Sequence, residues 1–376
     1  MTIFIGLMSG TSLDGVDGVL ARFPADPGQH SFDVMAHAHR GFAPALRDEL
    51  LALNASGLDE LHRAALAANA LTRVQAEVVQ TLLNNTSLSA EDVTAIGSHG
   101  QTLRHRPGEF DGTGYTLQIN QPALLAEACG ITVVADFRSR DVAAGGQGAP
   151  LVPAFHAQVF SRPDAPRAVL NLGGIGNLTL LPAANEASGV VRGFDCGPGN
   201  ALLDHWVQQQ RGEPFDDGGR WAMRGRILPD LLAALLAEPF LRRPPPKSTG
   251  RDLFNPAWLA THLAGLGAAA PADVQATLAE FTALAAAGAL LQEAPDTVEL
   301  LVCGGGALNA HVMGRLMAHL PGVRVASTAE AGLPPLQVEA AAFAWLARAC
   351  LLRQPGNRPE ATGARGPRVL GAIYPA

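Results

Sequence analysis

Four short turns rich in glycine, serine and threonine follow apolar segments of the chain and have the composition of phosphate-binding loops. They are Ser9–Ser12, Gly173–Asn177, Gly197–Asn200 and Gly304–Gly306. Glycine lets backbone N–H groups approach an anion closely, and serine or threonine adds hydroxyl donors. A single turn of this kind is most often only a tight turn, but four of them, two heading similar halves of the chain, favour a phosphate ligand. None fits G-x-G-x-x-G, since Leu202 takes the third glycine position after Gly197, which argues against a Rossmann dinucleotide site.

Asp195 is a candidate catalytic carboxylate, because it ends the apolar segment 190–194 just before a Gly-Pro-Gly turn. A carboxylate at the C-terminal end of a strand projects into the crevice where open α/β sheets bind ligands. A helix cap or a brace of the turn explains the same position equally well. Asp14 and Asp17 follow the first turn and could orient the water ligands of Mg²⁺, although capping or turn bonding is the commoner role of such residues.

Two groups of polar residues follow predicted strands and suit a sugar or a carboxylate ligand. The first consists of His99, Gln101, Arg104, His105 and Arg106, and the second of Arg138 and Arg140. Arginine binds carboxylates through two parallel hydrogen bonds, and the clustering favours a binding site over unrelated surface residues. A zinc protease and a serine hydrolase are disfavoured, since neither H-E-x-x-H nor G-x-S-x-G occurs.

Lys247 is the only lysine among 376 residues, and Pro246 precedes it, so the chain has no Walker A loop and no lysine is expected to hold phosphate groups. The net charge is 27 − 34 = −7 without a basic tract, which argues against a nucleic-acid partner. The four cysteines lie far apart, and neither a membrane span nor a signal peptide is apparent. We therefore expect a cytoplasmic protein without membrane or nucleic-acid partners. The oligomeric state stays open, with a homodimer among the options.

The pattern of apolar segments predicts two similar α/β halves. In the first half, strands over 2–7 and 16–23 flank a turn, a helical stretch covers 44–85, and short strands cover 93–98 and 131–135. The second half repeats strand, glycine turn and strand over 168–181, then continues with a strand over 190–194, a helix from 201, a helix over 273–292, a strand over 298–303 and a helix over 339–351. The Gly/Ala/Pro-rich stretch 141–153 suggests a crossing between lobes, which gives approximate domains of 1–142 and 143–376.

Taken together, these motifs resemble the anhydro-N-acetylmuramic acid kinase family. The resemblance runs in order through nearly the whole chain, in the segments GLMSGTSLDGVD (6–17), SHGQTLRHRP (98–107), ADFRSRDVAAGGQGAPLVP (135–153), NLGGIGNLT (171–179), FDCGPGNALLD (194–204), PKSTGRDLFN (246–255), LVCGGGALN (301–309) and VEAAAFAWLA (338–347).

This resemblance implies a two-lobed actin/hexokinase-like ATPase fold, with ribonuclease H-like lobes, a central cleft and a C-terminal segment that packs back on the first lobe. It implies a kinase that uses ATP with Mg²⁺ on 1,6-anhydro-N-acetylmuramic acid, in the recycling of cell-wall peptidoglycan. The product is N-acetylmuramic acid 6-phosphate. The residues implied to bind ATP are Ser9, Gly10, Thr11, Ser12, Leu13, Asp14, Gly15, Val16, Asp17, Gly173, Gly174, Asn177, Gly304, Gly305 and Gly306. The residues assigned to substrate are His99, Gln101, Arg104, Arg138 and Glu339, and no metal ligand is assigned.

By the same resemblance, Asp195 is the base that deprotonates the water attacking C1. An ordinary inverting glycosidase needs a second carboxyl group to protonate the leaving oxygen, whereas here the γ-phosphoryl group of ATP can capture O6. Two alternatives remain: a kinase for an ordinary N-acetylated aminosugar without ring opening, and a non-catalytic nucleotide-dependent clamp. The polar groups around 98–106 and 138–140 suit a small ligand better than a protein chain. Phosphate transfer from ATP to each sugar would separate the three.

Overall fold

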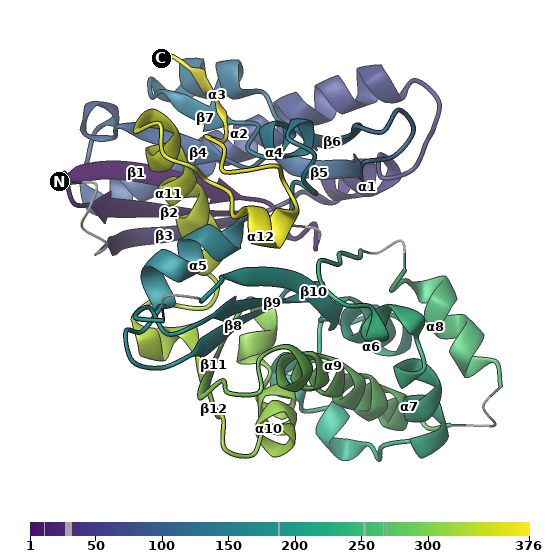
Figure 1. The fold of residues 1–376 in the computed structure, drawn as a ribbon. Helices are drawn as coiled ribbons and strands as arrows, with labels where there is room; N and C mark the ends of the chain where they lie inside the picture. The colour runs from purple at the N-terminus through teal and green to yellow at the C-terminus, as the bar shows by residue number, and fades with distance from the viewer. Residues whose placement is uncertain (11, 27–31, 187–188, 251–252, 266, 268) are drawn as a thin grey trace. The chain divides into compact units, whose positions relative to one another are not determined.

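The computed structural model describes residues 1–376 apart from 11, 27–31, 187–188, 251–252, 266 and 268. The chain forms two compact units, of which unit 1 comprises Met1–Val159 and Gln337–Ala376 and unit 2 comprises Phe160–Leu336 (Figure 1). The predicted boundary at 142/143 was approximate, and the chain instead passes between these units at 159/160 and 336/337. The stretch 141–153, expected to cross between lobes, lies within unit 1.

Unit 1 is built on a six-stranded sheet in the order β13-β7-β4-β1-β2-β3. Its strands are β1 (Thr2–Met8), β2 (Gly15–Phe23), β3 (Asp33–Gly41), β4 (Ala95–Ser98), β7 (Val133–Ala135) and β13 (Ala372–Tyr374). β1, β2 and β3 pair antiparallel, and β1, β4 and β7 pair parallel. The C-terminal strand β13 pairs antiparallel with β7, so the end of the chain packs on the unit that contains its beginning.

Unit 2 repeats this topology with five strands in the order β10-β9-β8-β11-β12. They are β8 (Arg167–Leu172), β9 (Ile175–Leu181), β10 (Arg192–Pro198), β11 (Glu299–Cys303) and β12 (Arg324–Ser327). Here too the first three strands form an antiparallel meander, and the first strand pairs parallel with the fourth, which pairs parallel with the fifth. Two units with the same strand order and the same parallel crossovers confirm the predicted fold of two ribonuclease H-like lobes.

The helices of unit 1 are α1 (Pro44–Ala52), α2 (Glu60–Thr86), α3 (Pro122–Cys129), α4 (Ser139–Ala143), α5 (Val152–Phe160), α11 (Val338–Leu351) and α12 (Pro359–Thr362), beside a hairpin of β5 (Gln101–Pro107) and β6 (Gly114–Ile119). The helix predicted over 44–85 is therefore two helices, divided at 53–59, where Asp59 takes a left-handed φ of 52°. α2 buries Leu71, Val78 and Leu82 in the core of unit 1. The spacings of seven and four residues between them place all three side chains on one face of the helix.

The helices of unit 2 are α6 (Ala201–Arg211), α7 (Pro229–Leu236), α8 (Pro256–Leu263), α9 (Pro271–Glu293) and α10 (Ala310–His319). α9 is long and apolar enough to cross a membrane by length and composition, but most of its apolar window is buried inside the protein. Its residues Leu278, Phe281 and Leu290 belong to the same core as Leu170 and Leu172 of β8. α9 is therefore the central core helix of unit 2, and it matches the helix predicted over 273–292.

Helix α11 lies unusually close to the sheet of unit 1, because two neighbouring strand positions are glycine. Gly6 of β1 and Gly97 of β4 are register partners, and a Cβ at Gly6 would overlap the backbone of Ala340 and Ala344. A Cβ at Gly97 would overlap the carbonyl of Phe343. Glycine in a strand interior often marks the close approach of another backbone. Gly6 thus allows α11 to pack closely against β1, the strand that leads into the turn Ser9–Ser12.

We expect Gly6→Ala to lower the free energy of unfolding by about 1–3 kcal/mol, because a close-packed helix must move away from the sheet. Chemical denaturation followed by circular dichroism measures the change. The control is Gly288→Ala in α9, where nothing lies within 4 Å of the added Cβ. Alanine has the higher helix propensity, so this control should be neutral or stabilising. Equal stability of Gly6→Ala and the wild type would contradict the proposed close contact.

Candidate active site

The turn after β1 is held by Gln101, which begins β5. Ser9 is buried and its Oγ donates to Oε1 of Gln101, while Nε2 of Gln101 donates to the carbonyl of Gly10 at 3.1 Å. Leu13 closes the turn by donating to the same carbonyl at 3.3 Å and takes a left-handed φ of 57°. Gln101, predicted to bind substrate, therefore lies against the turn predicted to bind phosphate. Thr11 is outside the described residues.

The side chains in the rest of the first predicted ATP segment differ in their exposure: some are buried and others reach the surface. Leu13, Gly15 and Val16 are buried, so these positions would meet a ligand through their backbone. Asp14 is exposed and accepts from the Ser12 hydroxyl at 2.8 Å. Oδ1 of Asp17 lies 3.2 Å from Nε2 of His37 and 3.1 Å from Nδ1 of His39, both on β3.

The buried His99, just after β4, forms hydrogen bonds with the half-buried Arg138. Nδ1 of His99 lies 2.8 Å from the carbonyl of Gly100, and its Nε2 accepts from Nε and Nη2 of Arg138 at 3.1 and 3.0 Å. Arg138 also donates from Nη1 to the carbonyl of Gly148 at 2.8 Å. Burial, and then repulsion by the Arg138 cation, lowers the pKa of His99 to about 3. His99 is therefore a neutral imidazole at pH 7 that orients Arg138.

The polar group after β4 does not gather at one point, because 101–107 is a strand. Alternate residues of a strand face opposite sides. Nη2 of Arg104 donates to Glu60 at 3.1 Å, His105 pairs with the Thr116 hydroxyl at 2.9 Å, and Arg106 lies 3.6 Å from Glu109. Arg140 is exposed on α4, and Glu339 is half-buried in the first turn of α11.

Asp141 is a buried carboxylate that sequence reasoning missed. It accepts from the N–H of Gly148 at 2.8 Å, from Nδ2 of Asn357 at 2.6 Å and from the Thr362 hydroxyl at 2.8 Å. These bonds tie the segment that carries Arg138 to the C-terminal residues. The sequence did mark Asp141 as a candidate, because it lies inside the family-like segment 135–153, four residues before the pair Gly145-Gly146.

In unit 2, Asp195 is half-buried on β10. Its N–H donates to the carbonyl of Lys247 at 3.1 Å, and its Oδ2 accepts from the N–H of Thr249 at 2.8 Å. A β-bulge shifts the pairing with β9 between Asp195 and Gly197. Bulges redirect side chains and are frequent beside active sites. Asp195 does not cap a helix, since α6 begins only at Ala201. It does brace a turn, through its two hydrogen bonds to the 247–249 segment.

The three glycine turns of unit 2 meet at the C-terminal ends of β8 and β11. The carbonyl of Gly173 accepts from the N–H of Asn200 at 2.8 Å, and that of Gly174 from Gly199 at 3.0 Å. Gly304, with φ of 78°, packs against Asn171 and Leu172. The predicted ATP residues Gly173, Gly174, Gly304, Gly305 and Gly306 thus belong to one group of loops.

A row of polar residues crosses the same sheet beside these turns. Asn171 of β8 is the register partner of Asn177 on β9, which is in turn the partner of Asp195 on β10. Register partners direct their side chains to the same face of a sheet. Asn171 was not predicted, and its buried Oδ1 accepts no hydrogen bond within the described part of the chain. Such an acceptor suits a ligand donor, for example a metal-bound water.

Among the described residues, no three His, Cys, Asp or Glu side chains are grouped to hold a metal ion. Mg²⁺ usually keeps several waters and binds through one or two carboxylates plus substrate phosphates. Asp14 and Asp17 of unit 1 are oxygen groups of the required kind, so these residues fit a magnesium ion that arrives with a nucleotide.

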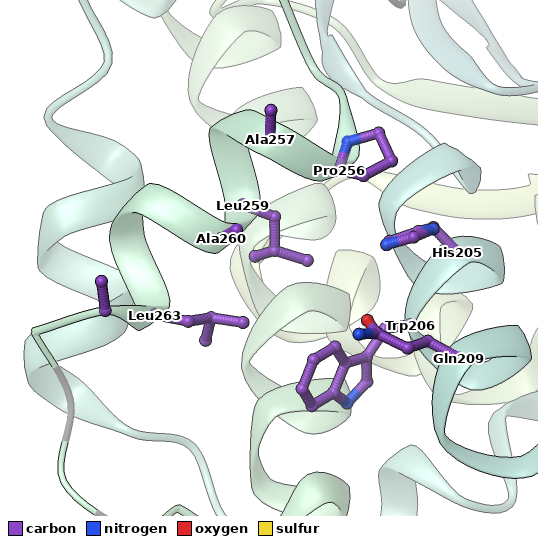
Figure 2. A pocket seen from close by; sticks show the side chains of 9 residues that line it. His205, Trp206, Gln209, Pro256, Ala257, Leu259, Ala260 and Leu263 are labelled. Atoms are coloured by element: carbon purple, nitrogen blue, oxygen red, sulfur yellow. The ribbon is translucent and has the colours of Figure 1, made fainter.

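A groove of about 600 Å³ opens between α6 and α8, and none of the predicted site residues lines it (Figure 2). Its lining is mostly apolar and includes Trp206, Leu259 and Leu263, with His205 and Gln209 at one side. Burial lowers the pKa of His205. The groove carries no nucleophile or paired carboxylates, so we assign it no catalytic role.

The buried histidines give the protein a specific acid sensitivity. Burial lowers the pKa of His99 and His156 to about 3 and of His105 to about 4, below the usual 6.5. The unfolded chain therefore binds these protons first, and stability is lost as pH falls below about 6.5, by up to about 1.4 kcal/mol per pH unit for each group. We expect the unfolding free energy to fall between pH 6.5 and 4. Histidine ring signals in NMR that titrate near pH 6.5 for all three would refute this assignment.

The whole chain matches known proteins. Residues 2–376 match the family model of anhydro-N-acetylmuramic acid kinase. A relative of that name from Variovorax paradoxus is 65% identical, covering 100% of this chain and 99% of the relative, and one from Bordetella petrii is 59% identical, covering 100% and 96%. Among solved structures, component A of (R)-2-hydroxyglutaryl-CoA dehydratase from Acidaminococcus fermentans is similar, with 13% identity, a TM-score of 0.47 and coverage of 92% of this chain and 96% of that one. The full-length match and the high identity show that this chain belongs to the anhydro-N-acetylmuramic acid kinase family.

Proposed function

We propose that this protein uses ATP to phosphorylate O6 of 1,6-anhydro-N-acetylmuramic acid while water opens the anhydro ring. The products are N-acetylmuramic acid 6-phosphate and ADP. The observation that carries the proposal is the 65% identity, over the full chain, to a relative named as this kinase. The half-buried carboxylate of Asp195, in a row with Asn177 and Asn171, supports it independently.

In the proposed reaction, Asp195 accepts a proton from the water that attacks C1. The bond from C1 to O6 breaks, and O6 takes the γ-phosphoryl group, so no second carboxylic acid is needed to protonate the leaving oxygen. The N–H of Thr249 holds one carboxylate oxygen and favours the ionised form that a base requires. A deprotonated base and the phosphoryl donor ATP, which leaves as ADP, therefore complete the step without an acid catalyst.

The glycine turns supply the proposed ATP contacts. Backbone N–H groups of the Ser9–Ser12 turn, and of the turns at Gly173 and Gly304, would hold phosphate oxygens without a lysine. Mg²⁺ would neutralise phosphate charge as the phosphoryl group transfers. Asp14 and Asp17 would hold its water ligands. A reaction that consumes ATP is consistent with a cytoplasmic setting.

On the sugar side, we propose that Arg138 binds the lactyl carboxylate and that Gln101, Arg104 and Glu339 contact the sugar or its waters. Arg138 carries a positive charge that His99 and Gly148 orient. His99 acts through Arg138 rather than by proton transfer, since its pKa is lowered to about 3. Guanidinium groups match carboxylates in geometry, which suits the one acidic group of this substrate.

The test is Asp195→Asn, which keeps the size of the side chain and removes its ability to accept a proton. Ring opening and phosphorylation should fall together by about 10²–10⁴-fold, the usual contribution of a general base. ATP binding should persist, because the proposed phosphate contacts are elsewhere. Asp217→Asn is the matched control, an exposed carboxylate of the same unit paired with Arg220 at 3.0 Å, and it should retain wild-type turnover.

Isotope labelling decides the mechanism and a substrate panel decides the substrate. In ¹⁸O-labelled water, the label should enter the hydroxyl on C1 and be absent from the transferred phosphate. Label in the phosphate would mean that water attacks phosphorus, which contradicts the assigned role of Asp195.

In the substrate panel, transfer to N-acetylglucosamine but not to the anhydro sugar would favour an ordinary aminosugar kinase. No transfer to any sugar would favour a nucleotide-dependent clamp.

A further inference from the structure

The segment 246–250 covers the outer edge of β10 at Asp195. β10 is the edge strand of its sheet, and β9 is its neighbour on the other side. The N–H of Asp195 donates to the carbonyl of Lys247 at 3.1 Å, and the N–H of Thr249 donates back to Oδ2 of Asp195 at 2.8 Å. The orientation of this carboxylate therefore depends on where the 247–249 backbone lies.

The side chain of Lys247 anchors that backbone. Its Nζ donates to the carbonyls of Leu241 at 3.0 Å and Phe240 at 3.3 Å, at the end of a short helical turn over Pro239–Arg242. The ammonium also lies 5.0 Å from the centre of the Phe240 ring and 5.9 Å from that of Phe194, the residue before Asp195. Cations are favoured both at helix C-termini and over aromatic faces, so these contacts fix the ammonium.

The charges around Lys247 include Asp195 itself. Burial lowers the pKa of Lys247. The nearby carboxylates of Glu293 and Asp195 raise this pKa, and the cation of Arg243 lowers it further. The attraction between the ammonium and the Asp195 carboxylate acts on both groups, so the cation favours the ionised form of Asp195. Cys196 is a neutral thiol at pH 7, because burial raises its pKa to about 12.

We propose that Lys247 is a positioning residue for Asp195: its ammonium fixes the 247–249 segment, and the N–H of Thr249 then orients the carboxylate toward the attacking water. The proposal rests on the role of Asp195 as the base. It accounts for the only lysine of the chain, which is absent from every proposed phosphate contact.

The primary test is Lys247→Met, which keeps an apolar stem over the Phe240 ring and removes the charge and its two hydrogen bonds. We expect kcat to fall about tenfold, because a misplaced catalytic group loses rate at this order or more. KM for ATP should stay within about twofold. The acid limb of the pH profile of kcat/KM should move to higher pH by roughly 0.5–1 unit, because loss of the cation makes Asp195 easier to protonate. Lys247→Arg should restore the acid limb.

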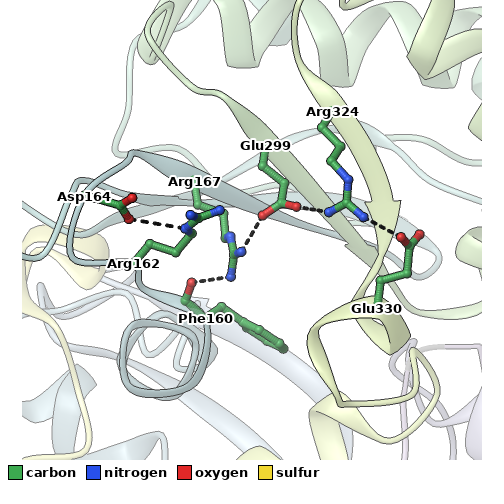
Figure 3. Close-up of polar contacts among 7 residues, drawn as sticks. All are labelled: Phe160, Arg162, Asp164, Arg167, Glu299, Arg324 and Glu330. Atoms are coloured by element: carbon green, nitrogen blue, oxygen red, sulfur yellow. Dashed lines mark hydrogen bonds and ion pairs between the residues drawn. The ribbon is translucent and has the colours of Figure 1, made fainter.

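Arg324→Met is the matched control, since it removes one positive charge from β12, the opposite edge strand of the same sheet. Arg324 binds Glu299 and Glu330 there, in the chain of ion pairs that also includes Arg167 (Figure 3). This control should leave kcat and the acid limb unchanged. An equal shift in both variants would mean that Lys247 acts only through the net charge, which overturns the positioning role.

A second pair of variants tests the orienting bond if Lys247→Met does not fold. Thr249→Pro removes the N–H that donates to Asp195, whereas Thr249→Ala keeps it. We expect kcat to fall much further in Thr249→Pro than in Thr249→Ala, because only the proline variant loses the donor. Equal kcat in the two variants would refute the orienting bond.

A double-variant cycle separates this proposal from the proposed function. If Asp195 is the base, adding Lys247→Met to Asp195→Asn should cost little further rate, because coupled residues are not additive. A further full tenfold loss overturns the positioning role and leaves the base intact. Near-normal turnover of Asp195→Asn overturns the proposed function itself. Loss of activity in Asp195→Asn, with wild-type kcat and acid limb in Lys247→Met, overturns only the positioning role.

Discussion

Parallel pairing of the first strand of each unit with a strand from later in the sequence is the constraint on which the candidate site depends. In unit 1, β1 pairs parallel with β4, so the turn after Met8 and the residues after Ser98 both follow the C-terminal ends of neighbouring strands. There Gln101 can hold both Ser9 and Gly10. In unit 2, β8 pairs with β11, and the turns at Gly173 and Gly304 meet in the same way. Parallel strands must be joined by long crossovers, which explains why these site residues are far apart in sequence.

The same constraint explains the chemical character of the site. Strand ends and tight turns present backbone N–H groups, which bind anions without a local positive charge. The proposed phosphate contacts therefore need glycine and hydroxyl residues, and the single lysine is free to serve elsewhere, against the carbonyls of Phe240 and Leu241. Positive charge on the proposed sugar side comes from Arg138, oriented by a neutral histidine. Neutrality of His99 matters here, because a charged imidazole would repel the guanidinium that it holds.

The sequence allowed the strand–turn–strand units, the long helices and the repeat of the two halves to be predicted, because their apolar periods are strong. Strand β3 was missed, since its alternation of Ala36, His37, Ala38 and His39 has small residues where strands usually have large ones. The run 101–107 looked like one polar cluster, and the pairing with β6 shows that it is a strand, in which His105 faces the side opposite to Arg104 and Arg106. Partners such as Asp141 with Asn357 and Thr362 join distant segments, and no local pattern reveals them.

Asp195 illustrates how local sequence and fold contribute differently to a site. Its place before a Gly-Pro-Gly turn left a cap and a catalytic base equally open, and the structure decides against the cap, because Asp195 lies within β10 and α6 begins only at Ala201. A base must be ionised, which the Thr249 N–H favours, yet it must still accept a proton during the reaction. The Thr249 N–H is a neutral donor, and a neutral donor stabilises a carboxylate less than a charged donor does. In the proposed reaction the leaving oxygen bonds to phosphorus and never needs the proton, so a single carboxylate is sufficient for the ring opening.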